Sequence, residues 1–257
     1  MKKRLLHISF NTENEEELLS FYEQAIKEKK KVFTLTPNLD HLRVSYKDKV
    51  FKDVINKADV STIDGVPILW IAKWLKIKEI KNKISGSDLS MKMLELLNQI
   101  GGSLFLFGGK DGVAELAKEK ISKDYPNIIV KGLLTPVFSY ETNDDLCHEY
   151  IKTINDSKSD VVFLCTGAPK TEKFFAKYYD KFDNSCYFSV GATIDFIAGN
   201  IKRAPQWMSK FGLEWLYRLT KDFKRLFKRY WLDGWFLIKI WFICHFKKKK
   251  VKQLMDE

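Results

Sequence analysis

Short, continuously apolar runs alternate along the chain with longer segments in which apolar residues recur at helical spacing. The runs predict five strands, at residues 31–36, 103–107, 127–131, 160–165 and 186–190. Helices are predicted at residues 88–100 and 113–122, where the apolar positions share one face. Apolar strands that alternate with amphipathic helices indicate an α/β fold, with a mostly parallel sheet and helices on both of its faces.

The pattern changes near Gly199 and Asn200, after which no strand is predicted. In residues 219–230 an apolar stripe is predicted on one side of a helix, and most of the basic residues fall on the other side. The stripe comprises Leu219, Phe223, Leu226, Phe227 and Tyr230. We therefore divide the chain into an α/β domain, residues 1–200, and a helical, basic and aromatic C-terminal appendage, residues 201–257.

The net charge of the 257-residue chain, +11, is concentrated in this appendage. Residues 202–257 hold 15 Lys and Arg against 5 Asp and Glu, so the rest of the chain is nearly neutral. The appendage also contains five of the seven tryptophans. Basic residues between aromatic ones suit an anionic membrane surface or a nucleic acid. We favour the membrane and expect no nucleic acid, because the Trp, Phe and Ile content after Trp231 suits lipid better than stacked bases.

The remaining composition indicates a cytoplasmic protein. The four cysteines are far apart and lack the spacing of a zinc site, which is typical of reduced thiols. The N-terminus lacks the long apolar core of a secretion signal. The longest apolar run, residues 235–246, is interrupted by Lys239 and His245 and falls short of the roughly 20 residues that cross a bilayer as a helix. We expect a protein that lies on the inner face of the cell membrane without spanning it.

Polar side chains that could carry chemistry follow the first predicted strand. Thr36 and Asn38 come directly after it, and Asp64 with Gly65 follows 26 residues later. A hydroxyl, an amide and a carboxylate at strand ends could position a sugar and remove a proton from an acceptor hydroxyl. The alternative is local: Asn38 caps the next helix, and Asp64 with Gly65 forms a turn.

Glycine-containing loops follow the later strands, where ligands of parallel sheets bind. Gly108 and Gly109 could bring backbone amides to a phosphate, although a plain tight turn is equally compatible with them. Residues 166–172 have the form of an ordinary connection from a strand to a helix. Gly191 would let a ligand approach the backbone, and Asp195 could bind a ribose or a base, or merely cap the end of the sheet.

The last cluster is basic: Arg203, Arg218, Arg225, Lys228 and Arg229. Spacings of seven and four place three of these arginines on one face of a helix, where guanidinium groups could clamp a diphosphate. The alternative is a solvated face that meets anionic lipid. No two aspartates lie two residues apart, so the chain lacks the DxD with which many nucleotide-sugar transferases hold a metal. Arginine and lysine would then have to neutralise a leaving group.

Together these pieces resemble the WecG/TagA/CpsF glycosyltransferases, glycosyltransferase family 26, from about Lys31 to Tyr230. The resemblance is carried by Thr36-Pro-Asn38, Ala58-Asp59, Asp64-Gly65, Ser85-Gly-Ser-Asp88, Gly108-Gly109, Gly167-Ala-Pro169, Glu172, Gly191, Asp195, Arg203-Ala-Pro205, Leu213-Glu-Trp-Leu-Tyr-Arg-Leu219 and Arg229-Tyr230. Each piece is common by itself, but their order and spacing are highly specific.

The resemblance implies a Rossmann-like, inverting, metal-independent transferase without a cofactor. Such an enzyme moves a sugar from a UDP-sugar to a polyprenyl-diphosphate-linked saccharide in bacterial cell-surface polysaccharide synthesis. By position, Asp64 would be the general base, and Thr36, counted with Asp64 as a catalytic residue, would line the sugar pocket together with Asn38. Asp195 would bind the nucleoside. In this family the appendage docks on the membrane and completes the site, often after an oligomer dissociates, so a homo-oligomer is among the expected partners.

The resemblance also assigns the other predicted site residues. Arg218, Arg225 and Lys228 would fold over the site and stabilise the UDP leaving group. The remaining substrate-binding set is Lys83, Gly108, Gly109, Gly167, Thr171, Glu172, Gly191, Arg203 and Arg229.

Three positions depart from the family pattern. Lys83 stands where the family usually has Arg, and Thr171 where it usually has Gln, so a donor with a substituent other than that of N-acetylmannosamine stays open. Asp222 and Phe223 replace an acidic-Pro pair, which predicts a continuous tail helix. The alternative to an enzyme is a non-catalytic nucleotide-binding protein on the membrane surface.

Overall fold

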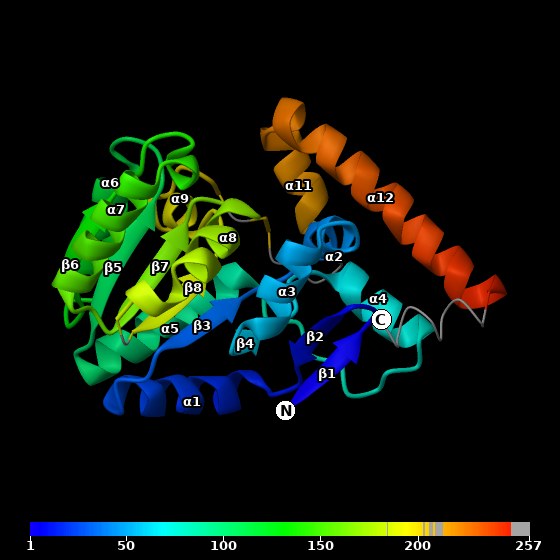
Figure 1. The fold of residues 1–257 in the computed structure, drawn as a ribbon, viewed down its shortest axis with the longest axis horizontal. Coiled ribbons are helices and arrows are strands. Elements are labelled where there is room, and N and C mark those ends of the chain that lie inside the picture. The colour runs from blue at the N-terminus through cyan, green and yellow to red at the C-terminus, as the bar shows by residue number, and fades with distance from the viewer. Residues whose placement is uncertain (184, 203, 206–207, 209–212, 248–257) are drawn as a thin grey trace.

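The computed structural model describes residues 1–183, 185–202, 204–205, 208 and 213–247. A six-stranded sheet lies at its centre, and all neighbouring strands pair in parallel in the order β4-β3-β8-β7-β5-β6 (Figure 1). The strands are β3 (Val32–Leu35), β4 (Val60–Ser61), β5 (Ser103–Gly108), β6 (Ile129–Leu134), β7 (Val161–Cys165) and β8 (Cys186–Ser189). The predicted α/β fold with a mostly parallel sheet is confirmed.

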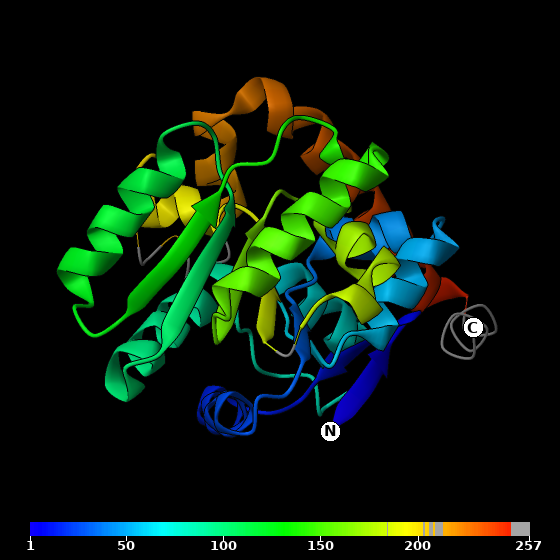
Figure 2. The same ribbon diagram turned by 60° about the vertical axis from the view of Figure 1, so that its left-hand side comes forward.

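Helices cover both faces of the sheet (Figure 2). One face packs against α1 (Glu15–Lys27), α5 (Gly86–Ile100), α6 (Val113–Asp124) and α9 (Thr193–Ala198). The other packs against α2 (Leu39–Ser45), α3 (Lys49–Lys57), α4 (Val66–Trp74), α7 (Asp144–Ser157) and α8 (Lys170–Lys177). The strands supply both layers because successive side chains point to opposite faces: in β5, Leu104 joins the first layer and Phe105 the second.

The five predicted strands are all present, within three residues at each end, whereas three further strands were missed. The predicted strand 127–131 runs from Ile129 to Leu134. β4 has only two residues, too few for a pattern to mark it. An antiparallel hairpin of β1 (Lys2–Leu5) and β2 (Ile8–Asn11) forms a second, two-stranded sheet beside the main one. Two 3₁₀ turns, η1 (Tyr140–Thr142) and η2 (Tyr179–Lys181), complete the described elements of the domain.

The tail is not one continuous helix, and that prediction is wrong. α11 (Glu214–Lys221) ends and α12 (Phe223–Phe246) begins around Asp222, whose φ of −142° and ψ of 62° are not helical. Thr220 and Asp222 are weak helix formers, so a break there is inexpensive. The break also sets α11 at an angle to α12, which runs across α2 and α4 (Figure 1).

The appendage shares the hydrophobic core of the domain. Phe236, Ile240 and Ile243 of α12 are buried in the same cluster as the helices on that face of the sheet. The predicted stripe of residues 219–230 is therefore split: Leu226 faces the body, whereas Phe223 and Phe227 face outward. Among the described residues, no helix is both long and apolar enough to cross a membrane. The division at residue 200 stays a prediction.

Candidate active site

Asp64 lies at the carboxyl end of the sheet, beside the segment that contains Thr36 and Asn38. Beyond β4 the chain continues along the end of β3, because the Thr62 amide donates to Leu35 O at 3.0 Å and the Asp64 amide to Pro37 O at 3.0 Å. Gly65 then turns the chain into α4 with a φ of +115°, which favours glycine. The structure thus brings together the two polar groups that the sequence separates by 26 residues.

The surroundings of Asp64 make it a perturbed carboxylate. Burial raises the pKa of Asp64, and the nearby charge of Glu214 raises it further. The positive charges of Arg218 and Lys83, and that of His41 when protonated, act in the opposite direction. A carboxylate with a raised pKa that still has cationic neighbours is suited to accept a proton in a partly dry site.

Thr36 is buried against the start of α5. A Cβ on Gly86 would lie 2.7 Å from the Thr36 Oγ1, which is too close. Ser85 caps α5, with its Oγ accepting from the Asp88 amide at 3.2 Å. The Ser-Gly-Ser-Asp segment therefore starts a helix at a point where only glycine leaves the Thr36 hydroxyl in place.

Asn38 is the N-cap of α2, as the local alternative predicted. Its Oδ1 accepts from the backbone amides of Asp40 at 3.0 Å and His41 at 3.3 Å. The same oxygen lies 2.9 Å from Nδ1 of the His41 ring and accepts from Nη2 of Arg229 at 3.4 Å. Capping fixes the direction of the Asn38 side chain. A role in the sugar pocket stays a prediction.

Glu172 and Thr171 are neighbours in α8 with different surroundings. Glu172 is only 2% exposed, its Oε1 accepts from Ser189 Oγ at 2.8 Å, and His41 Nε2 lies 3.7 Å away. Thr171 is fully buried, and its hydroxyl lies 2.7 Å from that of Thr166. Glu172 thus belongs to the polar group around Asn38, which it reaches through His41. The Thr171 hydroxyl instead forms an internal hydrogen bond with Thr166.

The predicted glycine loops follow three adjacent strands, β5, β7 and β8. Gly108 has a φ of +126°, and a Cβ there would lie 2.6 Å from backbone atoms of Cys165, so only glycine fits. Gly109, Gly167 and Gly191 also have positive φ. Asp195 is close enough for its charge to add to the burial that raises the pKa of Cys165 to about 12. These loops and Asp195 lie beyond the carboxyl ends of β5, β7 and β8, and their role in binding a substrate stays a prediction.

The basic cluster is divided between two helices, so the prediction of one shared helical face is wrong. α11 carries Arg218 to the site, where its charge acts on Asp64, its guanidinium lies 5.0 Å from the Phe196 ring, and it pairs with Glu214 at 2.6 Å. Lys228 is exposed on α12. Arg203 and the side chain of Arg225 lie outside the described part of the structure.

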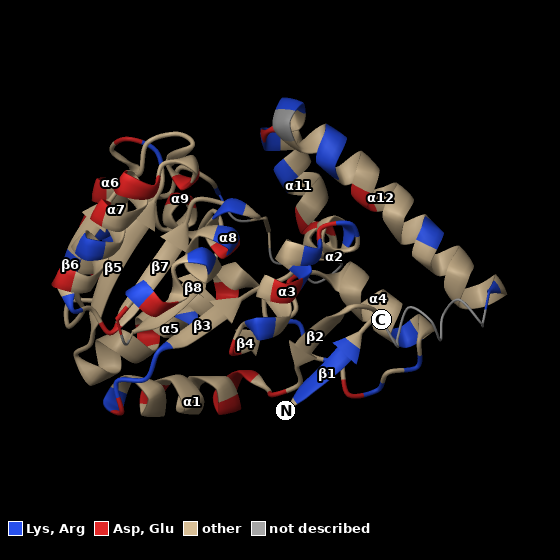
Figure 3. Ribbon diagram, viewed as in Figure 1, with Lys and Arg blue, Asp and Glu red and all other residues tan. Residues whose placement is uncertain are grey.

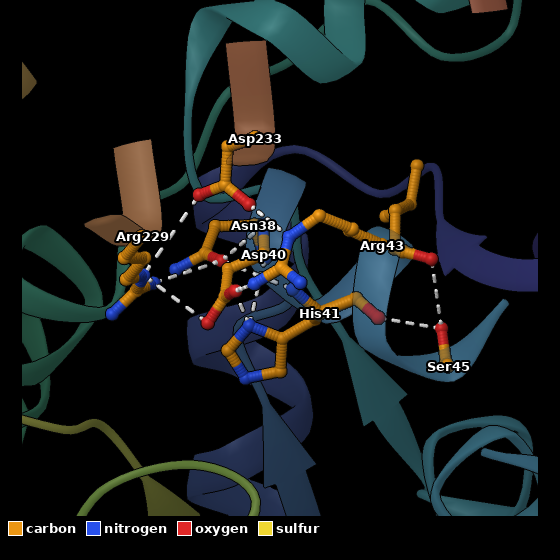
Figure 4. A network of polar contacts seen from close by, with 8 residues as sticks. Asn38, Asp40, His41, Arg43, Ser45, Arg229 and Asp233 are labelled. Atoms are coloured by element: carbon orange, nitrogen blue, oxygen red, sulfur yellow. Dashed lines mark hydrogen bonds and ion pairs between the residues drawn. The ribbon is translucent and has the colours of Figure 1, made fainter. Parts of the chain in front are cut away.

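Arg229 takes part in a network between α12 and α2 (Figure 4). Its Nε lies 3.1 Å from Asp40 Oδ2 and 3.9 Å from Asp233 Oδ2. Arg43 donates from Nε to Asp233 Oδ1 at 2.7 Å and also pairs with Asp40. We call Asp40, Arg43, Arg229 and Asp233 the clasp. Burial raises the pKa of Asp233, against the hydrogen bond from Arg43.

Several residues of the site were missed in the sequence. His41 stands three residues after its cap Asn38, and Glu214 stands four residues before Arg218, which are spacings of paired side chains on a helix. Asp233 is an acid within a run of apolar and basic residues, which also marks it. Within the described ranges, no three His, Cys, Asp or Glu side chains are grouped to hold a metal ion. The absence of a cofactor stays a prediction.

A partly buried carboxyl group with cationic neighbours, and glycine loops at the carboxyl ends of parallel strands, are compatible with an enzyme that acts on a phosphorylated ligand. Residues 3–251 match the model of the glycosyl transferase WecG/TagA/CpsF family. The chain belongs to this family, as its sequence motifs predicted, and it is a glycosyltransferase.

Similar curated proteins carry the name N-acetylglucosaminyldiphosphoundecaprenol N-acetyl-beta-D-mannosaminyltransferase. The one from Bacillus subtilis strain 168 is 30% identical over 188 residues, which cover 73% of this chain and 70% of that protein. Those from Bacillus spizizenii W23 and Staphylococcus aureus MW2 are 28% and 27% identical, over 75% and 76% of this chain and 72% and 74% of their own lengths.

Proposed function

We propose that the protein transfers a sugar, with inversion and without a metal, from a UDP-sugar to a polyprenyl-diphosphate-linked saccharide. The observation that carries this proposal is the position of Asp64, a carboxylate with a raised pKa at the carboxyl end of the sheet with Arg218 beside it. The names of the relatives, which specify an N-acetylglucosaminyl-diphosphoundecaprenol acceptor, support the acceptor class. The pathway would be bacterial cell-surface polysaccharide synthesis.

In the proposed reaction Asp64 is the general base. An acceptor hydroxyl attacks the anomeric carbon of the donor, the bond from that carbon to the diphosphate oxygen breaks, and the acceptor proton passes to Asp64. Direct displacement inverts the anomeric carbon. We assign Arg218, Arg225 and Lys228 to the stabilisation of the negative charge that develops on UDP.

The donor would lie across the carboxyl ends of β8, β7 and β5. We assign the nucleoside to Asp195, and the phosphates to the Gly108–Gly109 loop and the Gly167 and Gly191 turns. Nothing lies within 4 Å of a Cβ added at Gly167 or Gly191, so a ligand could approach the backbone there. Thr36, Asn38, Lys83 and Glu172 would surround the sugar. Because the Thr171 hydroxyl is engaged with Thr166, we do not assign it a contact with the sugar substituent. The structure therefore does not select the donor sugar, and we test three candidates: UDP-N-acetylmannosamine, UDP-N-acetylglucosamine and UDP-glucose.

We also propose that the protein is held at the inner face of the membrane by the outer side of α12. Large aromatic and aliphatic side chains are exposed along the whole helix, opposite the side that packs on the body. This outer aromatic face comprises Phe223, Phe227, Trp231, Trp235, Ile238, Phe242 and Phe246. Lys and Arg recur beside it on α11 and α12 (Figure 3). An apolar face with flanking cations suits a helix that lies in an anionic lipid interface.

The test is release of UDP by the purified full-length chain, with vesicles that contain the lipid-linked acceptor and each of the three donors. We expect turnover with one donor that persists in the presence of a chelator. Asp64→Asn should reduce kcat by about a hundredfold or more, whereas Asp53→Asn, an exposed carboxyl on α3, should not.

Two outcomes would contradict the proposal in different ways. Near-normal turnover by Asp64→Asn would remove Asp64 as the base. Binding of UDP without turnover of any donor would favour the alternative, a non-catalytic nucleotide-binding protein at the membrane surface.

Sedimentation of the same samples with and without vesicles tests the expected homo-oligomer and its dissociation on lipid.

A further inference from the structure

The clasp joins the appendage to the segment that contains Asn38, and two of its members lie on α12. Resting on the glycosyltransferase function proposed above, we propose that Arg229 and Asp233 are positioning residues that hold the Asn38 side chain at the sugar pocket. In this assignment Arg229 acts through Asn38 and does not bind the diphosphate of the donor.

The contacts of Arg229 favour a role in positioning Asn38 over a role in binding the diphosphate. Its Nε lies 3.1 Å from Asp40 Oδ2, and its Nη2 donates to Asn38 Oδ1 at 3.4 Å. Arg218, in contrast, lies on the other helix of the appendage, and its charge lowers the pKa of Asp64. A guanidinium whose Nη2 already donates to an amide oxygen, and which lies against the Asp40 carboxylate, is poorly available to a phosphate.

Asp233 determines where α12 sits. It is 6% exposed and lies on the inner side of the helix between the buried Leu226, Phe236 and Ile240. A carboxylate in an apolar seam is costly unless it is paired, so the helix is favoured in the register where Asp233 meets Arg43. The same register brings Arg229, one turn earlier on α12, to Asp40 and Asn38. One buried acid thus selects the contact that reaches the sugar pocket.

Asn38 is held from two sides as a consequence. Its Oδ1 accepts the α2 amides of Asp40 and His41 and the Nη2 of Arg229. Loss of the clasp removes the contact from the appendage, so the Asn38 side chain and the α2 cap that it makes are held less firmly. We expect the donor sugar to be positioned less well, because small displacements of a positioning group reduce the rate strongly.

The experiment compares kcat/KM for the donor in Asp233→Asn, Asn38→Ala and the double variant of the full-length chain. We expect Asp233→Asn to lose about tenfold to a hundredfold, and the double variant to be no worse than Asn38→Ala alone. The matched control is Ile243→Ala, which removes buried packing from the same side of α12 but lies outside the clasp. Its effect should multiply with that of Asn38→Ala.

Two results would overturn the proposal. Asp233→Asn could keep the wild-type kcat/KM, or the double variant could lose the product of the two losses measured in Asp233→Asn and Asn38→Ala separately. Hydrogen exchange provides a readout that does not need turnover. Asp233→Asn should accelerate exchange at the Asp40 and His41 amides, which Asn38 caps, more than Ile243→Ala does. If the wild type releases no UDP, the proposed function fails, but this exchange comparison still decides whether the clasp holds Asn38.

Discussion

The chemistry proposed here depends on single side chains held by neighbours that leave little room. Thr36 illustrates this, because its hydroxyl is placed by the absence of a side chain on Gly86, at the start of a helix from another part of the chain. Asn38 and Glu172 are likewise held by caps and by hydrogen bonds to buried groups. At this scale the site is sensitive to the volume of residues that have no chemistry of their own.

Gly86→Ala tests this sensitivity. Alanine is compatible with the first turn of a helix, but its Cβ would lie 2.7 Å from Thr36 Oγ1, so the hydroxyl must move. We expect a folded protein whose kcat/KM falls by about tenfold to a hundredfold, measured by UDP release and circular dichroism. Gly234→Ala is the control, because nothing lies within 4 Å of its added Cβ in the middle of α12. It should keep its activity and gain up to about 1 kcal/mol of stability.

At the scale of elements, α12 has two working sides. Its inner side contributes Phe236, Ile240 and Ile243 to the core and Arg229 and Asp233 to the clasp. Its outer aromatic face is exposed on the surface of the protein. The break at Asp222 makes this division workable, because α11 can point Arg218 at Asp64 while α12 follows the body in another direction.

If the outer aromatic face contacts the membrane, replacing a phenylalanine on this face by serine should weaken vesicle binding, whereas the same replacement elsewhere on the surface should not. Phe227 on α12 is 47% exposed and Phe21 on α1 is 41% exposed. Phe227→Ser should weaken binding to anionic vesicles by about tenfold or more, since burying a phenylalanine is worth about 1.5–3 kcal/mol. Phe21→Ser should leave vesicle binding unchanged. Equal effects of the two substitutions in a sedimentation assay would refute a membrane contact through this face.

At the scale of the whole molecule, the N-terminal hairpin and the C-terminal helix are linked through one packed region. His7, in the turn between β1 and β2, lies 2.8 Å from Ser45 Oγ and packs edge-on against Tyr46 at 5.6 Å between ring centres. Tyr46 in turn contacts Phe236 of α12 at 6.0 Å. Burial lowers the pKa of His7 to about 4, so the folded protein holds this ring neutral.

His7 therefore predicts a loss of stability in mild acid. Between pH 6.5 and about 4 the unfolded chain binds a proton at this position that the folded protein does not, so the free energy of unfolding falls as the pH falls. The loss is about 3 kcal/mol in total. In His7→Phe this part of the pH dependence should disappear, as measured by urea unfolding at pH 7 and pH 4.5. An unchanged difference between the two pH values would exclude His7 as its source.

The sequence by itself determined two kinds of feature: local periodic patterns of apolar residues, and motifs that occur in a specific order along the chain. Continuous apolar strands and amphipathic helices established the parallel sheet, because burial on both faces leaves that periodicity in the residues. The ordered motifs established the family and brought attention to Asp64, Thr36 and Asn38. Loops with glycine at strand ends were recognisable because a positive φ restricts the residue type.

Only the tertiary structure decided which of these groups meet. The break at Asp222 depends on where α11 and α12 find their partners, so the helical spacing of Arg218 and Arg229 wrongly placed both on one face. The pairing of Arg229 with Asp40 joins residues 189 positions apart, and no local pattern encodes it. Likewise the burial of Thr171, and the approach of Gly86 to Thr36, follow from how layers pack. Contacts between distant segments depend on shape and charge across the whole fold, which spacing along the chain does not record.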